Sequence, residues 1–153
     1  MEPTPHFSLS ALKAARPIGG WEDYWHDGRA FLRTASSAYQ QHKKAFTTVI
    51  LYNVIAMAIE KFVMAALMHQ GKLPLNHTMR DLVEAMEEVF PVAMADIRQG
   101  LLDLDRYQEI CDLDTFNISG PAMEEIPAML ELANRLHALV AYNFKENRCP
   151  TNT

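Results

Sequence analysis

The chain has 153 residues, a length that fits one domain around a single hydrophobic core. Hydrophobic residues make up 49% of it and charged residues 22%, a composition that excludes a disordered or fibrous protein. The net charge of -5 excludes a protein that is basic throughout, although an acidic chain can still carry a local basic groove.

Residues 1–20 are expected to form an arm that precedes the folded domain. They lack the basic start, the apolar run and the small-residue cleavage site of a secretory signal. The two cysteines, Cys111 and Cys149, show neither a C-x-x-C nor a zinc-binding spacing. A reducing compartment is the simpler setting for such a chain, and we predict a cytoplasmic protein.

The first helix is predicted from Trp21 to about Lys44. Acidic residues follow Gly20 in its first turn and lysines close its last, as the helix dipole favours. Apolar and small side chains recur at three- and four-residue steps, which is the helical period: Trp21, Tyr24, Trp25, Gly28, Phe31, Leu32, Ala35, Ala38 and Tyr39.

The next segment, from Phe46 to about Gln70, is long and apolar enough to cross a bilayer. Glu60 and Lys61 would then lie near the bilayer centre, where each costs about 2.5–3.5 kcal/mol, so we reject a membrane span. On a helix, Asn53 and Glu60 share a narrow polar stripe with Lys61 at its edge. We expect a helix that is covered by protein, at the centre of a bundle or in a dimer interface. The stripe is a candidate site, and the alternative is a structural Asn53 beside a surface-facing Glu60 and Lys61.

Two shorter helices are predicted next. A capping-box spacing at Thr78 starts a helix that continues to Phe90. Pro91 suits the first turn of another, which runs towards Tyr107 and is weakened in its middle by Gly100.

The helical period is lost from Glu109 to Gly120, which predicts a loop of about a dozen residues. A last helix follows, with a buried face formed by Ile126, Met129, Leu130, Ala133, Leu136, Leu139 and Val140. No strand pattern occurs. The predicted fold is therefore all-α, a five-helix bundle with an antiparallel four-helix core plus a short helix. It spans residues 21–144 and leaves a flexible C-terminal tail at 145–153.

Motifs for a metal, a cofactor or a catalytic nucleophile are not found. A di-iron bundle needs a Glu-x-x-His pair on each of two helices, and only His26 has acidic residues at such a spacing before it. The glycine-rich phosphate loops and the nucleophile elbow do not occur, and nothing places a base beside either cysteine. We therefore predict no metal, no cofactor and no catalytic residues.

From Ala58 to Met86 the sequence resembles the HEPN family of helical domains. The matching positions are Ala58, Glu60, Lys61, Ala65, Gly71, Pro74, His77, Arg80 and Leu82. The segment Leu102–Tyr107, a loop and a final long helix continue the family's layout, so the likeness spans most of Trp21 to Phe144. The resemblance implies a compact helical homodimer whose groove holds a nucleotide or RNA. It also implies a nucleotidyltransferase-like partner, as in toxin–antitoxin pairs.

The ribonuclease motif of the family is absent. HEPN ribonucleases carry an arginine followed by a histidine after four to six residues, and no arginine of this chain has a histidine at that spacing. His77 and Arg80 begin a predicted helix, whose N–H groups favour an anion, so we hypothesise a phosphate site there. The alternative is that His77 caps or packs and that Arg80 pairs with Glu84. Arg106 and Tyr107 are weaker candidates, for a guanidinium and a stacking ring beside the loop.

Three functions remain open. The first is a non-catalytic HEPN-like module that binds a nucleotide, RNA or a nucleotidyltransferase-type partner. The second is a pure protein–protein interaction module, which the apolar central helix and the two tryptophans favour. The third is a divergent HEPN ribonuclease whose site is assembled across a dimer, with His77 or His137 as its base.

Overall fold

The computed structural model describes residues 16–111 and 120–146, and these residues form only helices and turns. The helices are α1 (Trp21–Gln40), α2 (Thr48–His69), α3 (Met79–Val89), α4 (Pro91–Met94), α5 (Arg98–Asp103), η2 (Leu104–Cys111), η3 (Met123–Glu125) and α6 (Ile126–Glu146). The predicted all-α bundle is confirmed. Most of the predicted arm, most of the loop and most of the tail lie outside the described residues.

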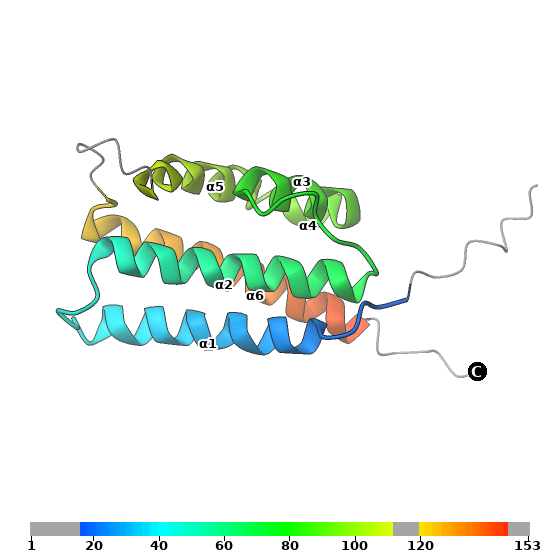
Figure 1. Cartoon of the computed structure of the whole chain (residues 1–153), viewed down its shortest axis with the longest axis horizontal. Helices are drawn as coiled ribbons and strands as arrows, with labels where there is room; N and C mark the ends of the chain where they lie inside the picture. The colour runs from blue at the N-terminus through cyan, green and yellow to red at the C-terminus, as the bar shows by residue number, and fades with distance from the viewer. Residues whose placement is uncertain (1–15, 112–119, 147–153) are drawn as a thin grey trace, which may run out of the picture.

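Figure 1 shows α2 between α1 on one side and the layer of α3, α4 and α5 on the other, with α6 behind. The middle of α2 faces the core, since Ile55, Ala58, Ile59 and Phe62 are fully buried. By length and composition α2 could cross a membrane, but 56% of its apolar window is buried inside the bundle. A helix at the centre of a bundle can have the same length and apolar composition, and in this structure α2 is the central helix.

Small residues let α1 lie close against α2. Gly28, Ala35 and Ala38 are all buried in this contact. A Cβ added at Gly28 would lie 2.8 Å from the ring atoms Cδ1 and Cε1 of Phe62, closer than real Cβ contacts. The approach of α1 therefore depends on the missing side chain of Gly28.

Helices α1 and α2 both end in a Schellman motif. At the end of α2, Lys72 N–H donates to Leu67 and Gly71 takes the left-handed conformation with φ 72. At the end of α1, Lys43 N–H donates to Ala38, and the left-handed residue is His42 with φ 48. The first helix therefore ends at Gln40, a turn before the predicted Lys44, and a histidine takes the place where glycine is usual.

The helix predicted from Pro91 to Tyr107 is wrong as a single element. It is divided into α4, α5 and η2: residues 95–97 form a turn between α4 and α5, and from Leu104 the chain continues as a 3₁₀ helix. Gly100 disfavours a continuous helix by about 1 kcal/mol relative to alanine. The breaks keep Ile97 and Leu101 buried as the chain passes over the core.

Candidate functional site

The seven residues predicted as a site lie in separate places. Glu60 meets His77 and Arg106 meets Tyr107, whereas the other three point elsewhere. The seven residues are Asn53, Glu60 and Lys61 on α2, His77 before α3, Arg80 in α3, and Arg106 and Tyr107 in η2. They do not line one common groove.

Glu60 and His77 form a direct contact between α2 and the loop that leads to α3. The distance from Glu60 Oε1 to His77 Nδ1 is 2.7 Å, and both side chains are partly open to solvent. The pair holds the loop against α2. One ring nitrogen of His77 is thereby committed to a carboxylate of its own chain.

Lys61 points away from Glu60, towards α1. Its Nζ lies 3.6 Å from Asp27 Oδ2 and 4.4 Å from the ring centroid of Tyr24, where it makes a cation–π contact. Asn53, seven residues before Glu60, is exposed on the same side of the helix and contacts neither partner. The polar stripe expected on α2 is therefore divided, because Glu60 and Lys61 serve different neighbours.

The N–H groups at the start of α3 are already bonded to side chains of their own chain. Thr78 caps the helix, its side chain accepting from the N–H of Asp81 at 3.2 Å. The carboxyl of Asp105 faces the N–H groups of Met79 and Arg80. Burial raises the pKa of Asp105, and the charge of Arg80 with those N–H groups opposes the rise. The Thr78 hydroxyl and the Asp105 carboxyl take the place where we had hypothesised a phosphate.

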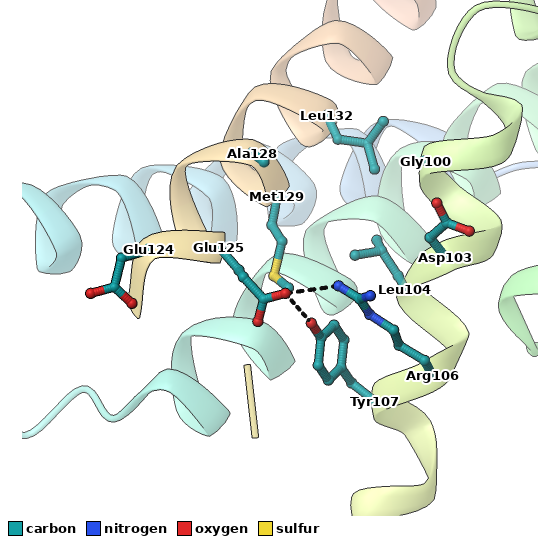
Figure 2. A pocket seen from close by; sticks show the side chains of 10 residues that line it. All are labelled: Gly100, Asp103, Leu104, Arg106, Tyr107, Glu124, Glu125, Ala128, Met129 and Leu132. Carbon is teal, nitrogen blue, oxygen red and sulfur yellow. Dashed lines mark hydrogen bonds and ion pairs between the residues drawn. The ribbon is translucent and has the colours of Figure 1, made fainter. Parts of the chain in front are cut away.

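Arg106 and Tyr107 line a cavity of about 410 Å³ between η2 and α6, shown in Figure 2. Its floor is apolar, formed by Leu104, Met129 and Leu132. Three carboxylates also line it, those of Asp103, Glu124 and Glu125, against the single guanidinium of Arg106. This charge balance disfavours a phosphate.

Glu125 holds this site together. Its Oε1 accepts hydrogen bonds of 2.8 Å from Arg106 Nη2 and of 2.8 Å from the Tyr107 hydroxyl, as the dashed lines in Figure 2 mark. Its Oε2 accepts from the N–H of Ala122 at 2.8 Å. That backbone bond, then the bond from Tyr107, lowers the pKa of Glu125. The carboxylate is therefore ionised at neutral pH and forms an ion pair with the guanidinium of Arg106.

Tyr107 is a poor platform for a nucleobase, although we had named it as a stacking ring. Its side chain is buried, 8% exposed. The guanidinium of Arg106 lies over the ring at 4.7 Å, and the ring of Tyr52 packs against it at 5.3 Å. Burial, then the bond to Glu125, raises the pKa of Tyr107, so the hydroxyl stays protonated as a donor.

His137, the other base considered for catalysis, is part of an aromatic cluster. Its ring stacks on Trp25 at 4.8 Å and 3°, and it lies 5.2 Å from the ring of Phe62. Burial, and then the charge of Arg29, lowers the pKa of His137. The imidazole is neutral at pH 7 and serves the packing of α6 on α1 and α2.

Replacing His137 with phenylalanine should reduce the loss of stability on acidification. A lowered pKa means that the unfolded chain binds a proton below about pH 6.5 while the folded chain resists it, so His137 costs stability as the pH falls through that value. Phenylalanine keeps a stacked ring without this proton. Denaturant unfolding at pH 7 and pH 5 measures the difference, with His26→Gln on the exposed face of α1 as control. An unchanged pH dependence in His137→Phe would contradict the assignment.

The structure adds residues that the sequence did not indicate. Glu125 follows Ala122 at capping-box spacing, but the usual Ser or Thr is missing, so its signal is only partial. Asp105 and Asp27 have no local signal, because their partners lie on other helices.

Comparison with known proteins adds no relative. No family model, no curated protein and no solved structure matches the chain. Within the described residues, no group of three His, Cys, Asp or Glu side chains is placed to hold a metal ion. The HEPN resemblance stays a prediction from the sequence between Ala58 and Met86.

Proposed function

We propose that the protein is a non-catalytic, HEPN-like helical module of the cytoplasm that works as a homodimer and binds a nucleotide or RNA, beside a nucleotidyltransferase-type partner. In this proposal α1, α2, α6 and the segment from α3 to α5 make the four-membered core. The order of two long helices, a short capped helix, an irregular segment and a final long helix supports it.

The commitment of the candidate bases carries the proposal that catalysis is absent. A ribonuclease of this type needs a free imidazole beside a cation that holds the phosphate. Here His77 is bound to Glu60, and His137 is stacked on Trp25. Arg106, which lines the cavity of about 410 Å³, is paired with a carboxylate. Bonded at Nδ1, His77 keeps Nε2 open, so the proposal rests on the stacked His137, on the paired Arg106 and on the missing arginine–histidine motif of the sequence.

An uncovered strip of α2 supports the homodimer. Ile50 is 41% exposed and Met57 is 42% exposed, and the exposed Asn53 lies between them on the same face. We call Ile50, Asn53 and Met57 the α2 strip. Two copies of this apolar strip related by a two-fold axis would cover each other, with Asn53 near its centre.

Thermal-shift measurements with nucleotides and short RNAs, followed by recovery of the RNA, test the function. The expected result is a higher melting temperature with at least one ligand and RNA of unchanged length. No stabilisation by any of them would count against nucleotide or RNA binding. Cleavage that disappears in His77→Ala and in His137→Ala would instead establish the divergent ribonuclease.

A second function, that of a pure protein–protein interaction module, is favoured by the cavity that Arg106 and Tyr107 line. Its apolar floor and its excess of carboxylates suit a basic side chain with an apolar stem, as on the surface of another protein. Capture of one specific protein that Glu124→Lys abolishes and that nucleotides do not affect would favour this function.

A further inference from the structure

We propose that the nucleotide site lies at the turn between α1 and α2, where a cavity of about 300 Å³ is lined by Tyr39, His42, Lys43, Lys44 and Phe46. The proposal rests on the function proposed above and gives it a place in the fold. None of the seven residues singled out in the sequence belongs to this cavity. We call it the turn cavity.

The backbone of the turn is fixed by its own hydrogen bonds. The N–H of His42 donates to Tyr39, that of Lys43 to Ala38, and that of Phe46 to Lys43, at 3.1, 3.1 and 2.9 Å. Two of these are the bonds of the Schellman motif. The α-carbons of both lysines are thus held in place, and a ligand has only their side chains to order.

The charge of the turn cavity is opposite to that of the cavity beside Arg106. Its lining includes two lysines and a histidine, and no carboxylate among the described residues that form it. Lys61 and Arg106 are in ion pairs within the described chain, and neither Lys43 nor Lys44 is in one. The first turn of α2, which starts here, carries no acidic residue that would offset the positive end of its dipole. A phosphate is the ligand group that this balance favours.

The remaining lining suits a planar apolar group. The rings of Tyr39 and Phe46 are half-buried, Leu51 forms a buried wall, and Met123 of η3 adds an adaptable apolar surface. The cavity lies at the lower end of the range for ligand pockets, about 300–1,000 Å³, so it fits one nucleotide unit. Stacking on such rings is tolerant of base identity. A free nucleotide and the end of an RNA strand both present a phosphate and one base, and these two groups are what the cavity fits.

Titration calorimetry with the full chain tests the site. The ligands are inorganic phosphate, AMP, ATP and a five-nucleotide RNA with a 5′-phosphate, each against the wild type and two charge-matched variants. Lys43→Gln/Lys44→Gln removes both lysines of the turn, and Lys72→Gln/Lys145→Gln removes two exposed lysines elsewhere. The first double variant should weaken nucleotide binding about tenfold or more, as loss of about 1.4 kcal/mol implies. The dissociation constant of the control variant should stay within about twofold of the wild-type value.

The variant Phe46→Leu distinguishes the contribution of the base to binding from that of the phosphate. It keeps the apolar character but removes the planar face, so AMP should bind more weakly while inorganic phosphate binds as before. AMP and inorganic phosphate of equal affinity in the wild type would overturn the part of the proposal that concerns the base. ATP and AMP binding without the RNA identifies a free nucleotide as the source of the phosphate, and binding of the RNA alone identifies a strand end.

The outcomes distinguish the location from the function. Binding to the wild type that Lys43→Gln/Lys44→Gln leaves unchanged overturns the turn cavity and leaves nucleotide binding standing. Binding of none of the four ligands overturns both. All four lysines are on the surface, so helical circular dichroism is expected to be equal in the three proteins and serves as the check on folding.

Discussion

Replacing Phe62 with alanine should lower the free energy of unfolding by about 3–5 kcal/mol, the usual range for a phenylalanine lost from a core. Phe62 is fully buried in the middle of α2, and its ring contacts Trp25 of α1 and His137 of α6. Three helices therefore lose a shared contact. Gly28 adds to the loss, because it packs on this ring and has no side chain that could move into the space left by the substitution.

Urea unfolding followed by circular dichroism measures the loss in Phe62→Ala. Phe31→Ala is the matched control, because Phe31 lies on α1 and is only partly buried against the same core. Its loss should be clearly smaller. Equal losses at the two positions would contradict the central place of Phe62 in the bundle.

Replacing Met57 with lysine should convert the proposed homodimer into a monomer. Met57 lies in the α2 strip and is 42% exposed in the single chain, so lysine is tolerated by the monomer's own fold. In a two-fold contact the two added charges would face each other in an apolar surface, where like charges are costly. Size-exclusion chromatography at several concentrations measures the change.

Met123→Lys is the control for this experiment. Met123 is 43% exposed, nearly the same as Met57, but it lies on η3 and outside the α2 strip. The control should keep the oligomeric state of the wild type. If both variants elute as the wild type does, the α2 strip is not the dimer interface.

Local signals in the sequence were enough to predict the bundle. The period of α1, the cap at Thr78 and the end of α2 at Gly71 each depend on residues that are near in sequence. The end of α1 shows the limit of such reasoning. A left-handed histidine at His42 has no strong signal, and the two lysines after it suited the last turn of a longer helix.

The candidate site could be predicted less well, because partners on different helices decide what a charged side chain does. Glu60 and Lys61 are neighbours in sequence, yet one binds His77 and the other Asp27. From the sequence alone Arg106 is interpreted as a free guanidinium, because its partner Glu125 lies 19 residues away and only the fold brings the two together. Conversely, Lys43 and Lys44 read as the end of a helix, and the fold places them beside Phe46 around one cavity.

The mass of the native protein, measured by light scattering in detergent-free buffer, tests whether a second copy of the chain covers α2 in addition to the helices of its own chain. One chain has a mass of 17.4 kDa, so the expected particle has twice that mass, 34.8 kDa. Its circular dichroism spectrum is expected to be that of a helical protein. A particle of 17.4 kDa would contradict the homodimer. A protein that stays in solution only with detergent would contradict the interpretation of α2 as the core of a bundle.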